Sequence, residues 1–389
     1  MNSLRPLIGA LALLVHMALP GLAQEAVQSF GPADAQSRLR LRTTTDIAIF
    51  APTVEAFLAT QPGLAIDFEQ WGSNDLFALT MRECAAGAPQ ADIVISSGVH
   101  QMVRLVNDGC AAPYRSAQTA LLPPELRWRD EIWGISREPA VMVYNRRLVP
   151  EAEVPRTRFD LLDLLRPSAS RYAGRVATYD IEESGLGFLF AFMDSQEAST
   201  FGALMEAFGR SGAVATCCSA EIIAGVAEGR YYMAYNVLGP YAQTQAARNP
   251  DLGIVHPADY TLVLSRAALF PGAEVPEAAG RFLDFVLSTE GQLAMGRSHL
   301  TRAHPDDGAA AEAPVDHPEV DPEMLHFDVS SKTEGIANIL ILHGDSDRIV
   351  SPSEAHRIYQ KARMPKRLIL LKNGDHAMGL AENQEKFVR

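Results

Sequence analysis

The chain has 389 residues, of which 47% are hydrophobic and 21% are charged. This length predicts two or three domains, and this composition excludes a disordered chain. The formal net charge is −13 at pH 7. A protein with this charge lacks the basic surface that nucleic-acid-binding proteins carry, and an anionic membrane surface would repel it. We therefore expect no nucleic-acid partner.

The first 23 residues are typical of an export signal. MNSLR gives a short positive start, LIGALALLVHMALP an apolar stretch, and Gly21, Leu22 and Ala23 a small-residue cleavage site. The apolar stretch is short for a membrane anchor, although an uncleaved anchor helix is the alternative, and no later run reaches the roughly 18 to 20 apolar residues that span a bilayer. We expect a periplasmic or secreted protein that is not embedded in the membrane after cleavage.

Four cysteines fit an oxidising compartment. If Cys84 pairs with Cys110, the adjacent Cys217 and Cys218 can close into an eight-membered ring, a strained and reducible disulfide. Two buried thiols are the alternative for this pair, and the sequence leaves the pairing open. Because Cys217 and Cys218 have no CxxC partner and no nearby His, we expect neither a metal site there nor a cofactor.

Lysine usage marks a boundary near residue 331. All five lysines, from Lys332 to Lys386, follow it, while residues 1–331 contain none. The stretch PDDGAAAEAPVDHPEVDP just before this shift is acidic and rich in Pro and Ala, which is typical of a loop or linker. We therefore expect residues 24–330 and 331–389 to have different origins.

Residues 38–330 alternate between strand and helix patterns. Strands are predicted for RLRLRTTT, LAIDFEQW, ADIVISSG, RVATYD, RYYMAYN and TLVLS, and two extended segments around Pro139 for EIWGISREPAVMVYN. Helical spacing is found in IAIFAPTVEAFLAT, residues 75–86, HQMVRLVNDG, LGFLFAFMD and AAGRFLDFVLS. This alternation predicts parallel α/β sheets, in which ligands bind beyond the carboxyl ends of the strands.

Hydroxyl-bearing loops follow three of the predicted strands. At the start of a helix, hydroxyls and backbone N–H groups suit a carboxylate or a phosphate, although each of these residues can equally be a helix N-cap. Tyr144, Tyr179 and Tyr235 stand near predicted strand ends, where they can line the same cleft or lie in the core. The sequence contains no P-loop lysine motif and no intact G-x-G-x-x-G motif, so a nucleotide ligand is not favoured. The candidate ligand-binding residues are Thr44, Thr45, Ser96, Ser97, Tyr144, Ser184, Gly185 and Tyr235.

Residues 38–330 resemble an extracellular solute-binding protein of a bacterial ABC transporter, of the kind that includes the ferric-iron-binding proteins. The resembling pieces are, in order, ADIVISSG, EIWGISREPAVMVYNRRLVP, RTRFDLLDLL, GRVATYDIEESGLGF, AYNVLGPYA and AGRFLDFVLSTEGQ. The resemblance implies the type 2 periplasmic-binding-protein fold, with two α/β lobes joined by a hinge. Lobe one would hold residues 38–138 and 255–330, and lobe two residues 139–254.

The same resemblance implies a receptor that captures a small ligand, which the hydroxyl loops predict to be anionic. Its partner would be the permease of an ABC importer, or a membrane sensor kinase if the protein is a sensor. Which ligand it binds, whether it transports or senses, and its oligomeric state are not readable from the residues.

Ferric iron is disfavoured as the ligand. Ferric-binding members of the resembled family carry two adjacent tyrosines just after the penultimate strand, where this chain has Gly239 and Pro240. Tyr231 and Tyr232 are adjacent but lie inside the predicted strand, where alternation points them to opposite faces. A hard ferric ion also needs several oxygen donors, and no His-x-x-Tyr or Asp cluster lies nearby.

Residues 335–389 resemble the C-terminal end of an α/β-hydrolase. ANILILHGDSDRIVSPSEAHRIYQKA and KRLILLKNGDHAM predict strand, loop, helix, strand and loop. The resemblance places the acid and the histidine of a catalytic triad at Asp347 and His376. No G-x-S-x-G motif supplies a nucleophile, so we expect an inactive fragment, whether a natural fusion or an artefact. The alternative is a serine hydrolase that uses Asp347 and His376 with an unrecognised Ser.

The signal-like start predicts that the exported protein begins at Gln24. Mass spectrometry of periplasmic material should find this residue at the N-terminus, because signal peptidase cleaves after small side chains. The variant Ala23→Glu should keep its leader. Finding intact Met1 on the periplasmic wild-type protein would contradict the prediction.

Overall fold

The computed structural model describes residues 24–167, 169–197, 200–300, 339–346, 352–361 and 363–372. The chain divides into two compact units, Met1–Val315 and Asp316–Arg389. The expected export signal, the compositional boundary near residue 331, and the triad candidates Asp347 and His376 lie outside the described residues and stay predictions.

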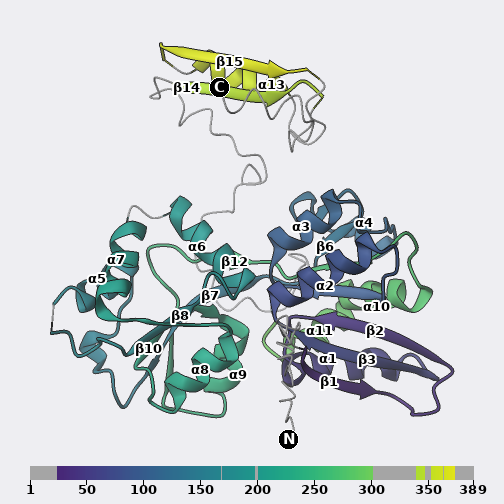
Figure 1. Ribbon diagram of the computed structural model, residues 1–389. Helices are drawn as coiled ribbons and strands as arrows, with labels where there is room; N and C mark the ends of the chain where they lie inside the picture. The colour runs from purple at the N-terminus through teal and green to yellow at the C-terminus, as the bar shows by residue number, and fades with distance from the viewer. Residues whose placement is uncertain are drawn as a thin grey trace, which may run out of the picture. The chain divides into compact units, whose positions relative to one another are not determined.

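Lobe one of the first unit is a seven-stranded sheet flanked by helices (Figure 1). Its strands lie in the order β1 (Gln24–Phe30), β3 (Leu64–Trp71), β2 (Ser37–Thr43), β4 (Ile93–Ser96), β13 (Ala267–Leu269), β6 (Ile132–Gly134) and β5 (Arg127–Trp128). The helices of this lobe are α1 (Ile47–Ala59), α2 (Ser73–Ala85), α3 (Val99–Asn107), α4 (Ala117–Leu121), α10 (Glu277–Leu287) and α11 (Thr289–Gly296).

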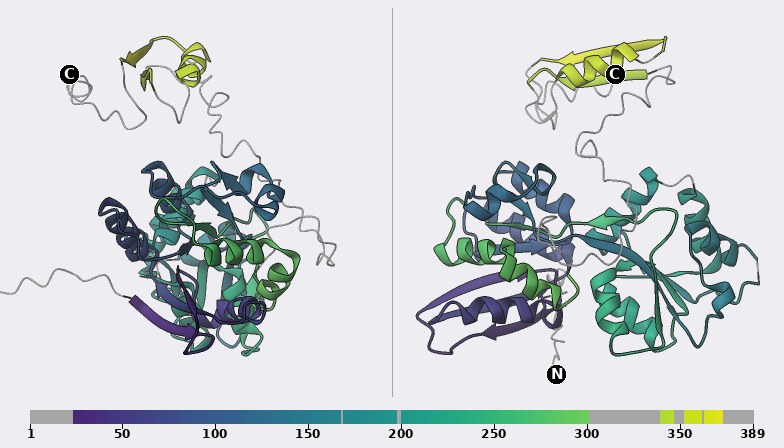
Figure 2. Two further views of the ribbon diagram at one scale, coloured as in Figure 1. Left: turned by 90° about the vertical axis from the view of Figure 1, so that its right-hand side faces the viewer. Right: turned by 180° about the vertical axis from the view of Figure 1, so that it is seen from behind.

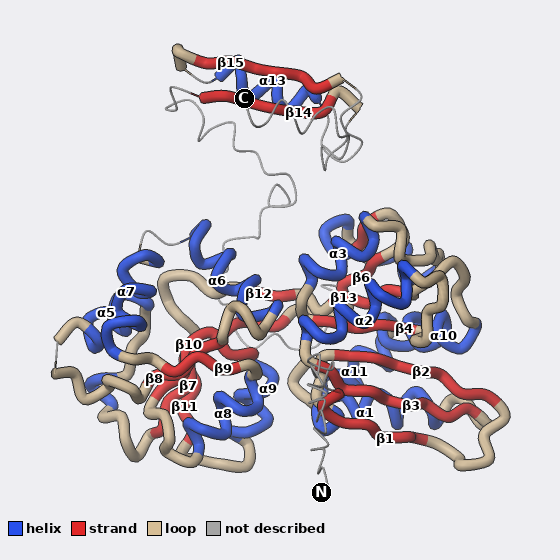
Figure 3. Tube along the Cα trace, in the orientation of Figure 1, coloured by secondary structure: helices blue, strands red, loops and turns tan. Residues whose placement is uncertain are grey.

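Lobe two is built around a second sheet, which Figure 3 shows with its own helices. Its strands lie in the order β11 (Leu252–Val255), β7 (Glu138–Asn145), β10 (Met233–Leu238), β8 (Val176–Tyr179) and β9 (Val214–Thr216), and β12 (Val263–Leu264) pairs with β7. The helices of this lobe are α5 (Arg158–Leu165), α6 (Gly185–Glu197), α7 (Phe201–Ser211), α8 (Ser219–Ala227) and α9 (Gly239–Ala246).

Both sheets are mixed, so the prediction of wholly parallel sheets is wrong. β2 runs parallel to β3 and β4, and β8 runs parallel to β9 and β10, but β13 and β7 pair antiparallel with their neighbours. The physical reason is that the chain crosses between the lobes twice, so that some strands enter their sheet from the opposite end. Strand β1 was not anticipated, because its largely exposed residues pair only along one edge with β3 and show no apolar alternation.

The core of lobe one is held by edge-to-face aromatic contacts. Phe50 meets Phe68 at 6.3 Å and Phe282 at 6.3 Å between ring centroids, and Phe57 meets Phe282 at 5.0 Å. These rings come from α1, β3 and α10. Two helices that are far apart in sequence therefore pack together against the sheet. Such pairs contribute about 0.5–1.5 kcal/mol each beyond the burial of their area.

The hinge consists of two neighbouring chain segments that run between the lobes, which can be followed in Figure 2. One links β6 to β7 and the other links β12 to β13, and they are hydrogen-bonded to each other, Ile135 N donating to Arg266 O at 2.8 Å. At this crossing the Arg266 guanidinium donates to both carboxylate oxygens of Glu138 at 3.0 Å, and neither side chain is exposed (0%). The ion pair therefore ties one crossover segment to the other.

The second unit contains a single strand–helix–strand motif among its described residues. β14 (Ile339–Gly344) and β15 (Lys366–Leu371) pair in parallel, and α13 (Pro352–Lys361) lies between them in the chain. The order matches the prediction made from the sequence, and a parallel pair of this kind requires a crossover connection. A likeness to an α/β-hydrolase does not follow from this motif and stays an inference from sequence.

Substituting Glu138→Gln should destabilise the protein strongly, by about 3–5 kcal/mol, because it leaves the buried charge of Arg266 without its partner. Denaturant unfolding measures the change. Glu206→Gln is the matched control, since it breaks the exposed pair with Arg210 at 2.9 Å, and exposed pairs contribute about 0–1 kcal/mol. Equal losses in the two variants would contradict the role given to the hinge pair.

Candidate functional site

A pocket that is open to solvent lies between the two lobes. Lobe one lines it with Glu25, Thr44, Asp46, Trp71, Gly72, Ser73 and Ser97. Lobe two lines it with Tyr179, Glu183, Ser184, Leu186, Cys217, Cys218, Ser219, Leu238 and Tyr241. The lining set contains five hydroxyl groups of Ser and Thr, three carboxylates and no Lys or Arg.

The pocket lies where strands end and helices begin. Lining residues stand at or directly before the first residue of α1, α2, α6, α8 and α9, and Ser97 lies two residues before the start of α3. A helix N-terminus carries unpaired N–H groups and roughly half a positive charge, so such an end attracts anions. Six helices therefore turn their positive ends toward this region.

The hydroxyl groups in the pocket hold one another and the loops in place. Thr44 Oγ1 lies 3.1 Å from Ser97 Oγ and accepts from Ser97 N at 3.0 Å. Ser73 Oγ accepts from Gly185 N at 2.9 Å, which is a direct bond between the lobes. Ser219 Oγ accepts from Leu238 N at 3.0 Å and also bonds the Tyr179 hydroxyl. The oxygens are fixed before any ligand arrives.

Carboxylates oppose the positive helix ends. Burial raises the pKa of Asp46, although the Tyr241 hydroxyl donates to its Oδ1 at 3.0 Å and Arg266 lies near. Burial also raises the pKa of Glu25, against the effect of Gln70 Nε2, which donates to it at 2.9 Å. The nearby Asp46 carboxylate raises the pKa of Glu25 as well. Both therefore take up a proton more readily than an exposed carboxyl would.

A positive charge lies behind the hydroxyl loop instead of in the pocket. Arg266 Nη1 donates to Thr45 Oγ1 at 2.9 Å and lies 3.4 Å from Thr44 Oγ1. Burial alone would lower the pKa of Arg266, but the adjacent Glu138 raises it overall, so the guanidinium stays charged. An anion next to Thr44 would feel this charge through one layer of hydroxyls.

Of the eight predicted ligand-binding residues, Thr44, Ser97 and Ser184 line the pocket. Gly185 lies at the contact between the lobes, where a Cβ would come within 2.6 Å of Gln101 Oε1, so this position accepts only glycine without a shift of that side chain. Thr45 and Ser96 are buried behind the pocket. Thr45 holds Arg266, and Ser96 Oγ accepts from Gly98 N at 3.0 Å next to the start of α3.

The predicted tyrosines Tyr144 and Tyr235 lie in the core of lobe two, away from the pocket. Tyr235 donates to Asp194 Oδ2 at 2.6 Å and accepts from Arg158 Nε at 2.6 Å, both within a buried cluster. Tyr179, by contrast, lines the pocket from the end of β8. Strand alternation alone could not tell which tyrosine faces the other lobe.

Sequence reasoning missed several lining residues. Ser73 lies between the end of β3 and the first turn of α2, as Ser97 lies between β4 and α3, so the rule that found Ser97 would also have found Ser73. Asp46 and Tyr241 carried no signal of their own, because their contact joins residues 195 positions apart. Ser219 begins α8 after the short strand β9, and because the sequence pattern did not predict that strand, the same rule could not find Ser219.

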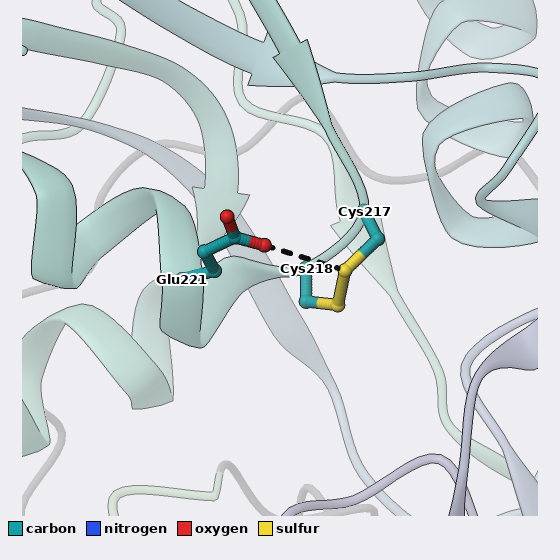
Figure 4. A group of neighbouring side chains, drawn as sticks. All are labelled: Cys217, Cys218 and Glu221. Atoms are coloured by element: carbon teal, nitrogen blue, oxygen red, sulfur yellow. Dashed lines mark hydrogen bonds between the residues drawn. A yellow bond between two sulfur atoms is a disulfide. The ribbon is translucent and has the colours of Figure 1, made fainter. Parts of the chain in front are cut away.

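Both disulfides form, so the alternative of two free thiols at Cys217 and Cys218 is wrong. Cys84 bonds Cys110, and Cys217 bonds Cys218 (Figure 4). Within the described part of the chain, Cys217, Cys218 and Glu221 are the one group of three His, Cys, Asp or Glu ligand atoms close enough to hold a metal. Thiolates bind metals and disulfide sulfurs do not, so the bonded pair is not a metal site.

The two tyrosines in the pocket are also poor ligands for ferric iron. Burial raises the pKa of Tyr179 and of Tyr241 well above the ordinary value, and each hydroxyl already has a partner within the protein, Ser219 for Tyr179 and Asp46 for Tyr241. Gly239 and Pro240 begin α9, at the place where paired tyrosines were expected for iron binding.

Comparison with known proteins identifies the family. The family described as "Bacterial extracellular solute-binding protein" matches residues 88–327. The chain belongs to this family. The substrate-binding protein of an ABC transporter from Agrobacterium tumefaciens is 34% identical, with 76% of this chain and 88% of that chain covered and a TM-score of 0.71. The two-lobed periplasmic-binding-protein fold is thereby confirmed, and this is a family of binding proteins, not of enzymes.

Two more distant structures share the fold alone. Iron-bound HitA from Pseudomonas aeruginosa is 20% identical, with 71% of this chain and 90% of that chain covered and a TM-score of 0.58. AfuA from Actinobacillus pleuropneumoniae, with fructose-6-phosphate bound, is 18% identical, with 69% and 85% covered and a TM-score of 0.56. No curated protein matches the chain. None of the helices that the structure describes is long and apolar enough to cross a membrane.

Asp46→Asn tests the buried carboxylate. Because the pKa of Asp46 is raised above 3.8 in the folded protein, folding takes up a proton, and stability falls as the pH rises through the raised pKa. The amide can still accept from Tyr241, so the variant should be up to about 1 kcal/mol more stable than wild type at pH 7. Its melting temperature should also depend less on pH between about 4 and 7. A variant that is less stable at pH 7 and keeps the full pH dependence would contradict this.

Proposed function

We propose that this solute-binding protein captures a small anionic solute and delivers it to the permease of an ABC importer. The observation that carries the proposal is the convergence of six helix N-termini and five Ser and Thr hydroxyls on one pocket between two lobes. The 34% identical substrate-binding protein of an ABC transporter supports the importer. A sensor kinase as partner has no comparable support.

The donors in the pocket suit an oxyanion. The N-cap residues of α2, α3, α8 and α9 make no side-chain cap hydrogen bond, so a bound oxyanion can take that place. Arg266 adds attraction from behind Thr44 and Thr45 without contacting the solute. Neutral hydrogen-bond donors and helix N-termini thus supply the attraction for the solute, which suits a site that must release its solute again.

The carboxylates narrow the choice of solute. A fully ionised polyanion beside Glu25 and Asp46 would be repelled, whereas an anion that also carries a hydroxyl, an ammonium or an acidic proton can donate to them. The raised pKa of both residues lets them bind such a proton together with the solute. A monoanion with a hydrogen-bond donor fits this pocket best.

The lobes meet directly around the pocket. Ser73 bonds Gly185 N, Asn74 Nδ2 donates to Glu182 O at 2.8 Å, and Asp46 N donates to the Tyr241 hydroxyl at 3.0 Å. A solute that bridges the lobes would add to these contacts. Opening would break them and turn the lobes about the two crossover segments, in the manner of a hinged binding protein.

The direct test is a ligand-dependent shift in melting temperature. Inorganic phosphate, fructose 6-phosphate, citrate, glycine and ferric citrate cover the oxyanion, zwitterion and iron possibilities. A solute present at 100 times its Kd should stabilise the folded protein by about 2.7 kcal/mol. Stabilisation by ferric citrate and by none of the other compounds would contradict the anionic-solute proposal in favour of iron.

Substitutions at two adjacent serines distinguish a role in ligand binding from a role in holding the loop before α3. Ser97→Ala should weaken the binding of the best stabilising compound by about 1–3 kcal/mol, since it removes an oxygen that lines the pocket. Ser96→Ala is the matched control, because its oxygen holds Gly98 N outside the pocket. Loss of this buried hydrogen bond should lower stability by about 1 kcal/mol and leave affinity unchanged. Calorimetry on both variants decides, and equal affinities would show that Ser97 plays no part in binding.

A further inference from the structure

The bond between Cys217 and Cys218 forms part of the pocket wall. It joins two neighbouring residues in the loop between β9 and α8 (Figure 4). Both residues line the pocket. Both are partly exposed, as is Cys84 of the other disulfide, whose partner Cys110 is 2% exposed within the core of lobe one. Of the two disulfides, only Cys217–Cys218 has its residues in the lining of this pocket.

We propose that the Cys217–Cys218 disulfide is a ligand-contacting wall that selects solutes carrying an aliphatic segment beside their anionic group. This inference rests on the proposed function and adds a specificity determinant to it. The bonded sulfurs have no hydrogen to donate and present a polarisable, apolar surface, which favours contact with CH groups over contact with water. Trp71, Leu186 and Leu238 supply the other apolar side chains of the pocket.

A role in overall stability does not explain the bond. The stabilisation from a disulfide grows with the length of the loop that it closes, and this one joins residues that are one position apart. Cys84–Cys110 closes a separation of 26 residues and ties the end of α2 to the segment after α3. The adjacent pair constrains only its own loop, so its effect is confined to the pocket surface that the loop forms.

Neighbouring contacts hold this loop against the pocket. Ser219, the next residue, bonds the Tyr179 hydroxyl and accepts from Leu238 N at 3.0 Å, so β8 and the start of α9 fix it. On the other side, Thr216 Oγ1 donates to Glu221 Oε2 at 3.0 Å. Cys217 Sγ lies 3.7 Å from the same oxygen, and because a disulfide sulfur carries no proton, this is a packing contact that the carboxylate makes with the ring.

The bond also changes the start of α8. Cys218 is the N-cap residue of this helix, a position where Ser, Thr, Asp and Asn are preferred, and its side chain makes no capping hydrogen bond. A serine there would bond its own helix N–H groups. With the sulfur committed to Cys217, those donors stay available to an anion that rests its aliphatic part on the disulfide. The apolar wall and the positive helix end thus act on the same solute.

Reduction would undo both effects. A dithiol such as dithiothreitol passes two electrons and two protons to the pair, so the S–S bond breaks, two S–H groups form, and the reductant becomes a cyclic disulfide. The two side chains then rotate independently, and the fixed apolar surface is lost.

The test compares two probes that differ by one aliphatic group, inorganic phosphate and ethyl phosphate. Calorimetry is run at about pH 5, where both probes are monoanions that keep an acidic proton. It compares wild type, the double variant Cys217→Ser with Cys218→Ser, and the control Cys84→Ser with Cys110→Ser. Wild type should bind ethyl phosphate at least fivefold more tightly than inorganic phosphate. The pocket variant should reduce this ratio to twofold or less, while the control variant should keep it, even if it melts at a lower temperature.

Wild type treated with dithiothreitol provides a second measurement should the pocket variant fail to fold. Mass spectrometry after alkylation confirms that only Cys217 and Cys218 have opened, and the ratio should again fall to twofold or less. The proposed role of the Cys217–Cys218 disulfide is contradicted if wild type shows no preference for ethyl phosphate. It is also contradicted if the preference survives both reduction and the double substitution. A wild-type protein that binds neither probe and no compound of the wider anion panel would instead overturn the proposed function.

Discussion

The buried pair of Arg266 and Glu138 is the interaction on which the rest of the structure depends. Moving two charges out of water costs several kcal/mol each, and only full pairing and hydrogen bonding offset that. Here the guanidinium meets both carboxylate oxygens and Thr45, and Ser136 donates to Glu138 at 2.6 Å. These partners come from both crossover segments and from the first hydroxyl loop. The pair therefore fixes the hinge and the floor of the pocket together.

The electrostatics of the pocket follow from this arrangement. Arg266 sits behind the hydroxyls and is neutralised by Glu138, so the pocket itself receives only the partial charges of the helix ends and the opposing carboxylates. A lysine or arginine inside the pocket would bind an anion more strongly but would also slow its release. Partial charges that act over a short range, with carboxylates that can take up a proton, hold a solute reversibly and distinguish it by its hydrogen-bond donors.

The strands and helices were predictable from sequence because apolar periodicity is local. LAIDFEQW forms β3 over the same residues that its pattern indicates, and ADIVISSG contains β4. The direction of the strands, the edge strand β1 and the pairing of Arg266 with Glu138 were not predictable, since each depends on contacts between distant parts of the chain. The adjacent Ser96 and Ser97 show the limit at the site. Ser96 accepts from Gly98 N and Ser97 lines the pocket, and a strand pattern that repeats every two residues distinguishes them only when the facing lobe is known.

The same limit on prediction from sequence applies to the cysteines. Their spacing identifies which residues can pair, but it does not reveal which surface the bond faces, because that is set by the packing of β8, β10 and α8 around the loop. A bond between neighbouring residues closes almost no loop, so chain entropy gives it little reason to be present. It lies on the pocket surface and takes the N-cap position from a residue type that would have satisfied the helix. Its value to the protein must therefore lie in the surface that it presents to the solute.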